Sequence, residues 1–141
     1  GEDDFDMVLS VPEEVESFVN ETKVDACAIA IGSQHAMQKQ EANLDFERLK
    51  EISELVEVPL VLHGSSGVVE EELTRVAEFG IQKVNIGTRL KRVFTDTMRE
   101  FLAENPDNHN HITVLEAASE QLTEEVIHKM KLLGCENSAV E

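Results

Sequence analysis

Apolar and polar residues follow a repeating order along the middle of the chain, in which a short apolar run precedes a stretch with helical apolar spacing. The apolar runs cover residues 24–31, 58–63 and 83–86, and the helical stretches cover residues 46–56, 69–79 and 90–102. This order predicts three strands, each followed by an amphipathic helix. Because successive parallel strands need a crossover helix, the pattern predicts an α/β fold with one parallel sheet covered on both faces.

The flanking segments predict helices joined by loops. Residues 1–23 form an acidic loop and a helix, the turn at 105–108 breaks the chain, and a last helix runs from about 115 to 133 before Gly134. No change of composition divides the sequence, so we expect one domain over residues 1–141: loop and helix at 1–23, three βα units at 24–104, and a C-terminal loop and helix at 105–141. The opening leads straight into loop and helix, so we expect a piece of a larger protein.

The charge balance excludes several classes of partner. The chain has 12 Lys and Arg against 29 Asp and Glu, a net charge of −17, which repels nucleic acid and anionic lipid. No apolar run approaches the roughly 20 residues that cross a bilayer, and the acidic start is unlike a signal peptide. Cys27 and Cys135 form no disulfide framework. We expect a soluble, cytoplasmic protein in which any phosphate ligand is held by a local site.

Polar residues stand where each predicted strand ends. Since the carboxyl ends of parallel strands gather the functional groups of such folds, His35 and His63 are expected near each other. Two neutral imidazoles at successive strand ends suit a shared zinc ion. The alternative is that each histidine is a hydrogen-bonded loop residue, and the sequence leaves both interpretations open.

Two segments that follow predicted strands suit an anion. The turn at 64–67 offers backbone N–H groups little obstructed by side chains, although an ordinary glycine-rich βα turn explains it equally well. Residues 85–88 precede a basic cluster, namely Arg89, Lys91 and Arg92. Cations near a helix N-terminus oppose the helix dipole, so the cluster favours a bound anion, with a solvated helix face as the alternative.

Together, the segments 24–35, 44–46, 58–67 and 83–88 resemble the class II ketose-bisphosphate aldolases, within them the fructose- and tagatose-bisphosphate branch. The resemblance implies a (β/α)₈ TIM barrel with zinc on three histidines, of which this chain is the C-terminal half: the last three parallel βα units plus a C-terminal helix. It also implies a lyase of glycolysis and carbohydrate metabolism. The reaction is reversible cleavage of a ketose 1,6-bisphosphate to dihydroxyacetone phosphate and glyceraldehyde 3-phosphate.

The resemblance also assigns roles to residues. It makes His35 and His63 zinc ligands and lets Asn85 hydrogen-bond the triose part of the substrate. The residues that it places at the phosphate of dihydroxyacetone phosphate are Gly64, Ser66, Gly87 and Thr88. Glu2 is a weaker candidate for proton transfer. The family's acid–base Asp and another zinc His come from an upstream strand end absent from this sequence, so we expect the isolated chain to be inactive and to associate with the missing half or as a homo-oligomer.

Some positions depart from the family pattern. The family commonly has His-Gly-x-Tyr-Lys at the first metal strand, where this chain has Ala36 and Gln38. Gly87 stands where relatives carry Ala or Asp, a position tied to substrate preference, which leaves fructose versus tagatose open. The competing hypotheses are a non-catalytic remnant that binds sugar phosphate or mediates association, and a phosphate-binding barrel of another reaction.

Overall fold

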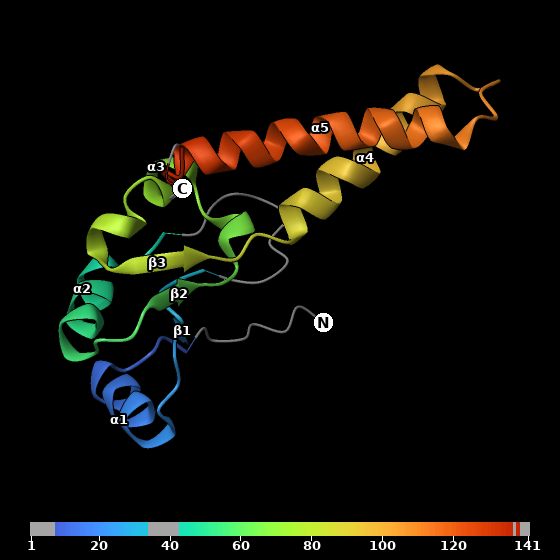
Figure 1. Cartoon of the computed structure of the whole chain (residues 1–141). Coiled ribbons are helices and arrows are strands. Elements are labelled where there is room, and N and C mark those ends of the chain that lie inside the picture. The colour runs from blue at the N-terminus through green and yellow to red at the C-terminus, as the bar shows by residue number, and fades with distance from the viewer. Residues whose placement is uncertain (1–7, 34–42, 137, 139–141) are drawn as a thin grey trace. The chain divides into compact units, whose positions relative to one another are not determined.

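The computed structural model describes residues 8–33, 43–136 and 138. The chain divides into two compact units, Gly1–Asn85 and Ile86–Glu141, and each is described by itself below (Figure 1). The division falls directly after the third strand end, at a point where the sequence shows no change of composition.

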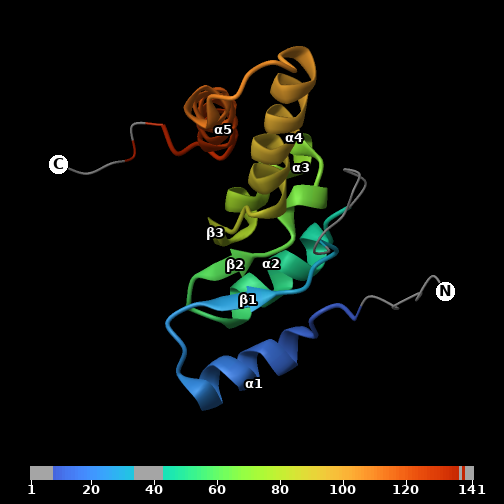
Figure 2. The same ribbon diagram turned by 90° about the vertical axis from the view of Figure 1, so that its right-hand side faces the viewer.

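A parallel sheet forms the centre of the first unit. Its strands are β1 (Cys27–Ile29), β2 (Leu60–Leu62) and β3 (Ile81–Val84), in the spatial order β1-β2-β3 (Figure 2). Both pairs are parallel, which confirms the fold class predicted from the sequence pattern. Strands β1 and β2 are shorter than their apolar runs, whereas β3 is as long as the run at 83–86 but begins two residues earlier. At β2 one cause is Pro59, which lacks an N–H for the ladder and therefore stands just before the strand.

Helices and tight turns complete this unit. They are α1 (Pro12–Thr22), α2 (Phe46–Leu55), the 3₁₀ turn η1 (Ser65–Gly67), α3 (Glu70–Leu73) and the 3₁₀ turn η2 (Val76–Phe79). The single helix predicted over residues 69–79 is wrong, because α3 ends after one turn and η2 follows. Where α3 ends, the Thr74 hydroxyl donates to the carbonyl of Glu71, a local bond that competes with helix continuation.

The core of the first unit joins the sheet to its helices. All three residues of β2, the central strand, are buried. The largest fully buried side chains come from strand ends, α2 and the segment after β2: Ile31, Leu49, Ile52, Leu60, Leu62, Val68, Leu73 and Val76. Burying such aliphatic groups is the main favourable term in folding, so this cluster holds the sheet against its helices.

The second unit is a helical hairpin of α4 (Thr88–Glu104) and α5 (His111–Leu132), which lie side by side (Figure 1). Helix α5 begins earlier than the predicted residue 115, because the Asn110 side chain accepts a hydrogen bond from the Ile112 N–H and caps it. Among the described residues, no helix has both the length and the apolarity to cross a membrane.

Candidate functional site

The carboxyl ends of β2 and β3 bring a histidine and an asparagine into contact. His63 follows β2 directly, and Asn85 follows β3 directly. The Asn85 amide nitrogen lies 3.4 Å from Nδ1 and 3.3 Å from Nε2 of His63. The Asn85 N–H also donates to the Leu62 carbonyl at 3.0 Å, so the ladder between the strands extends into the site. His63 and Asn85 thus lie at the carboxyl ends of neighbouring parallel strands, whereas His35, the residue expected near His63, lies outside the described residues.

Two serine hydroxyls link the neighbouring strand ends. Ser33, after β1, donates to the carbonyl of His63 at 2.5 Å, and Ser65 donates to the carbonyl of Asn85 at 2.9 Å. Ser65 is only 3% exposed, so its hydroxyl is committed to this bond. Sequence reasoning assigned neither serine a role, although their positions just after strands were a usable signal.

The turn predicted to hold an anion is tightly folded. Gly64 has φ 67° and ψ 17°, a left-handed conformation that glycine adopts without steric cost. The N–H of Gly67 donates to the Gly64 carbonyl, and the N–H of Val68 donates to the Ser65 carbonyl. Ser66 is half-buried within this turn. The helix that follows does not assist anion binding, because α3 is one turn long and carries glutamates throughout its first turn.

A hollow of about 420 Å³ opens beside His63. It is lined by the backbone and side chains of β1 and its extension, Ala28, Ile29 and Ala30, together with Ser33 and His63. This volume lies in the range of small-molecule sites. The half-buried imidazole therefore faces a space that a ligand can enter.

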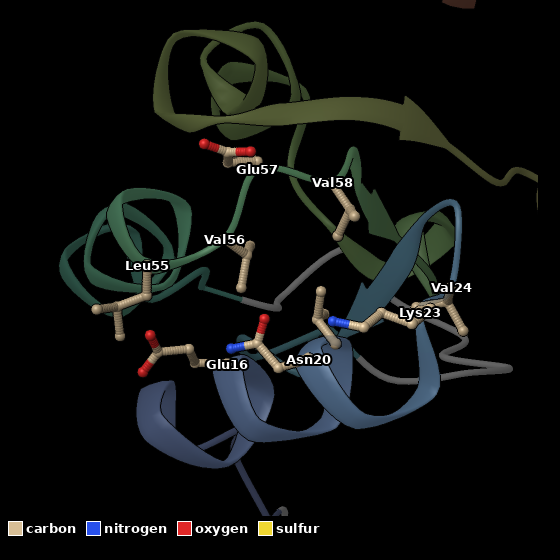
Figure 3. A pocket seen from close by; sticks show the side chains of 9 residues that line it. Glu16, Asn20, Lys23, Val24, Leu55, Val56, Glu57 and Val58 are labelled. Carbon is tan, nitrogen blue, oxygen red and sulfur yellow. The ribbon is translucent and has the colours of Figure 1, made fainter.

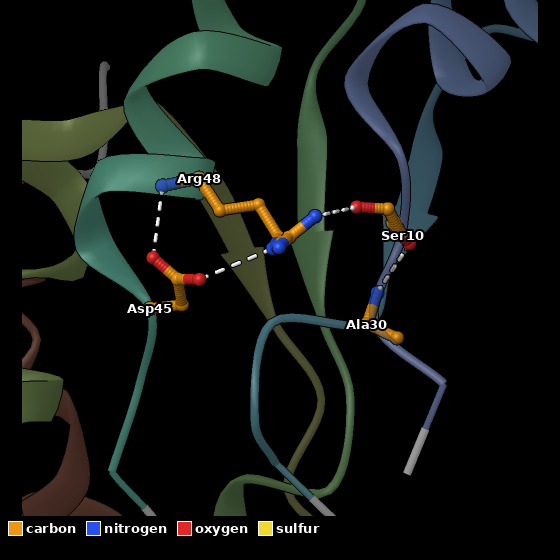
Figure 4. A network of polar contacts seen from close by, with 4 residues as sticks. All are labelled: Ser10, Ala30, Asp45 and Arg48. Atoms are coloured by element: carbon orange, nitrogen blue, oxygen red, sulfur yellow. Dashed lines mark hydrogen bonds and ion pairs between the residues drawn. The ribbon is translucent and has the colours of Figure 1, made fainter.

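A polar network fixes the carboxyl end of β1 (Figure 4). The Ser10 N–H donates to the Ala30 carbonyl at 2.8 Å, and the Ala30 N–H donates to the Ser10 hydroxyl at 2.9 Å. Arg48 of α2 donates to the Ser10 carbonyl at 2.8 Å and pairs with Asp45 at 3.1 Å. The hydrogen bond from the Arg48 backbone N–H, followed by its side-chain bond and charge, lowers the pKa of the Asp45 carboxyl. The network ties the segment before α1 to β1 and α2.

Several predicted site residues fall elsewhere. His35 and Glu2, with Ala36 and Gln38, lie outside the described residues. Gly87 and Thr88 belong to the second unit, where Gly87 is the N-cap of α4 and Thr88 its first residue. Their assignment as phosphate ligands stays a prediction.

One residue of the basic cluster after the third strand, Arg89, forms an ion pair within the hairpin. Both Nε and one terminal nitrogen of Arg89 donate to the Glu125 carboxylate of α5 at 3.0 Å. These bonds, with the charge of Arg89, lower the pKa of Glu125. The helix hairpin brings a carboxylate against this guanidinium, so the sequence-based argument for an anion does not apply to Arg89.

The donors present are compatible with a metal but do not complete a site. Within residues 8–33, 43–136 and 138, no group of three or more His, Cys, Asp or Glu side chains could hold a metal ion. His63 is the zinc candidate that the described part contains. An imidazole nitrogen is a common zinc ligand, but a neutral imidazole has one lone pair, which cannot accept the hydrogen bond from the Asn85 amide and bind a metal at the same time. The donor type of His63 therefore fits zinc when that lone pair is not taken by Asn85.

The model of the class-II fructose-bisphosphate aldolase family matches residues 1–138. The chain belongs to the class-II fructose-bisphosphate aldolase family. This match covers nearly all of the sequence, including the strand ends that carry His63 and Asn85. It confirms the family resemblance read from the sequence.

Solved aldolase structures share the fold. The YdjI aldolase from Escherichia coli K12 superposes with a TM-score of 0.82 at 31% identity, covering 94% of this chain and 48% of that one. A Coccidioides immitis protein, provisionally named a fructose-1,6-biphosphate aldolase, gives 0.78 at 28% identity, with 93% and 45% covered. Fructose-bisphosphate aldolase from Campylobacter jejuni gives 0.75 at 20% identity, with 96% and 49% covered, and supports the fold alone.

These structures also define how much of the barrel the chain represents. The aldolases matched have the TIM-barrel fold, and this chain spans about half the length of each. The parallel βα units described above are therefore part of a (β/α)₈ barrel.

Proposed function

We propose that this chain forms part of a zinc-dependent aldolase that reversibly cleaves a ketose 1,6-bisphosphate, fructose or tagatose, to dihydroxyacetone phosphate and glyceraldehyde 3-phosphate. The observation that supports this most strongly is the contact between His63 and Asn85 at the carboxyl ends of adjacent parallel strands, in a member of this family. Catalytic groups of barrel enzymes lie at that end of the strands.

Each residue has a defined task in this proposal. His63 and His35 hold the zinc ion, which when bound polarises the ketone oxygen of the substrate as a Lewis acid. Asn85 donates its amide hydrogen bond to the triose part, and its contact with the imidazole restrains the orientation of both groups. Glu2 remains the weaker candidate for moving a proton.

Neutral donors hold the phosphate in this proposal. The candidates are backbone and hydroxyl groups of Gly64, Ser66, Gly87 and Thr88. A fixed set of N–H and O–H donors binds an oxyanion at short range, whereas the chain's charge of −17 repels it at long range. Recognition of the phosphate then depends on the local turn rather than on the field of the protein.

Other parts of the proposal concern the surroundings of the chain. We propose a cytoplasmic enzyme of carbohydrate metabolism whose activity requires the rest of the barrel, in the same polypeptide or in an associated one, with a homo-oligomer as the alternative assembly. The competing function is a remnant that binds sugar phosphate without catalysis. Ala36 and Gln38, which replace a family Gly and Tyr, favour that alternative.

Zinc titration tests the metal assignment. We expect weak binding by the wild-type chain, because two imidazoles fill half of a tetrahedral shell. The variant His63→Ala should abolish the calorimetric signal, whereas His109→Ala, an exposed histidine in the loop before α5, should leave it unchanged. An isotherm that His63→Ala does not alter would remove His63 from the metal site and with it the proposed mechanism.

A further inference from the structure

A second hollow lies at the opposite end of β1 and β2 from His63. It has a volume of about 450 Å³ and is enclosed by the C-terminal ends of α1 and α2 and by the segments that lead into the two strands (Figure 3). All of its lining residues belong to the first unit. Its volume is typical of small-molecule sites, and the aldolase chemistry proposed above makes no use of this end of the sheet.

Three polar side chains line this hollow from the α1 side. Glu16 and Asn20, at positions i and i+4, lie on one face of the helix, and Lys23 is the C-cap residue that follows α1. In Figure 3 the Lys23 ammonium group extends toward the side of Asn20, whose amide nitrogen points toward Glu16, and the Glu16 carboxylate lies toward Leu55 of α2. The charges of opposite sign are thus offset along about two helical turns, roughly 10 Å.

The facing wall of the hollow is apolar. Leu55, Val56 and Val58 line it, and Val19 adds a further aliphatic group from α1. Glu57 also lines the hollow, but its carboxylate points away from α1 (Figure 3). The α1 side of the hollow therefore presents one positive and one negative group, Lys23 and Glu16, to an aliphatic wall.

The backbone of Lys23 is held in an unusual conformation. Across the described residues, Lys23 is the one non-glycine residue with positive φ, at φ 56° and ψ 38°. Glycine is the usual residue where a helix ends in this way, because a Cβ is strained there. A lysine one turn earlier would complement the helix dipole equally well without that strain. Strained backbone conformations concentrate at functional sites, so the conformation of Lys23 indicates a function for its side chain.

The charges select the class of ligand. A simple anion is repelled by Glu16 and by the chain's net charge of −17, and a simple cation can pair with Glu16 but makes no favourable contact with Lys23. A small zwitterion meets both groups with the correct sign and carries no net charge. We propose that this hollow binds a small aliphatic α-amino acid, with its carboxylate on Lys23 and Asn20, its ammonium group toward Glu16, and its side chain against Leu55 and Val56.

Calorimetric titration of the 141-residue chain with L-leucine tests the proposal. We expect saturable binding that weakens at least about tenfold in Lys23→Gly and in Glu16→Gln. The matched control is Lys50→Gln, which removes an exposed lysine of α2 that pairs with Glu54 at 3.9 Å, and it should leave affinity unchanged. Since glycine fits the left-handed conformation, Lys23→Gly should also raise Tm, so its loss of binding cannot come from misfolding.

Two analogues separate the zwitterion from a single charge. N-acetyl-L-leucine lacks the ammonium group and L-leucine methyl ester lacks the carboxylate, and both should bind at least about tenfold more weakly than L-leucine. The proposal is overturned by the absence of saturable binding, by equal affinity of Lys23→Gly, or by equal affinity of either analogue. The His63→Ala variant should bind L-leucine normally, so failure of this site and failure of the proposed aldolase function give different results.

Discussion

Gly32 allows the chain to turn directly after β1, at the edge where the candidate site lies. Its φ is 115°, and a Cβ at this position would lie 2.3 Å from the carbonyl oxygen of Asn43. The variant Gly32→Ala therefore has to move backbone atoms and should lower the free energy of unfolding by at least about 2 kcal/mol. Urea denaturation measures this loss.

Gly87 provides the matched control for that substitution. An added Cβ at Gly87 meets no atom within 4 Å, and its φ of −129° is open to other residues. Gly87→Ala should change the free energy of unfolding by less than about 1 kcal/mol, the range of helix N-cap preferences. Equal losses for the two alanine variants would contradict the close packing at Gly32.

Single residues of the site were predictable where they follow a strand. His63 and Asn85 directly follow β2 and β3, and the parallel pairing of these strands brings both residues to the same edge of the sheet. The supporting bonds of Ser33 and Ser65 were not predictable, because they depend on which carbonyl of a neighbouring strand comes within reach. The left-handed conformation of Lys23 was not predictable either, since a positive φ is not expected of lysine.

The α4–α5 hairpin rests in part on the ion pair between Arg89 and Glu125. The lowered pKa of Glu125 means that the folded state favours the carboxylate, so the pair stabilises the hairpin above the unfolded pKa of glutamate, and this contribution is lost as pH falls through the folded pKa. Arg89 is 48% exposed, but Glu125 also pairs with the buried Lys129 at 3.7 Å, so we expect Glu125→Gln to cost at least about 1 kcal/mol at pH 7.

Thermal unfolding followed by circular dichroism measures that cost. The difference between wild type and Glu125→Gln should shrink toward zero at pH 3, where the carboxyl becomes protonated in the unfolded chain and increasingly so in the folded one. Glu120→Gln, an exposed position on α5, should show no comparable effect. A difference that persists unchanged at low pH would show that the pair does not contribute through charge.

Helix and strand boundaries were the least predictable features at the level of elements. Continuous apolar spacing over 69–79 does not reveal that the chain switches from α3 to η2, because the switch depends on local hydrogen bonds such as that of Thr74. Strands β1 and β2 are shorter than the apolar runs because residues beyond the ladder are still buried, as Ile31 is. A run of apolar residues indicates burial, but a buried residue need not belong to the hydrogen-bonded strand ladder.

For the whole molecule, the order of apolar runs and helical stretches was enough to predict a parallel α/β sheet. The family match and the aldolase structures agree with that prediction and show that the chain spans about half of such a barrel. The division after Asn85 was not predictable, because no linker or change of composition marks it. Compactness depends on tertiary contacts that a single sequence pattern does not encode.

The central claim is that this chain carries one part of an aldolase site, centred on His63. Its most direct test fuses the 141 residues to the part of the YdjI aldolase that they do not match and measures dihydroxyacetone phosphate released from fructose and tagatose 1,6-bisphosphate in a coupled assay. We predict cleavage by the fusion that a chelator removes and that His63→Ala abolishes, with none from the 141 residues alone. Chelator-resistant cleavage, cleavage by the unfused chain, or full activity of the His63→Ala fusion would contradict the account.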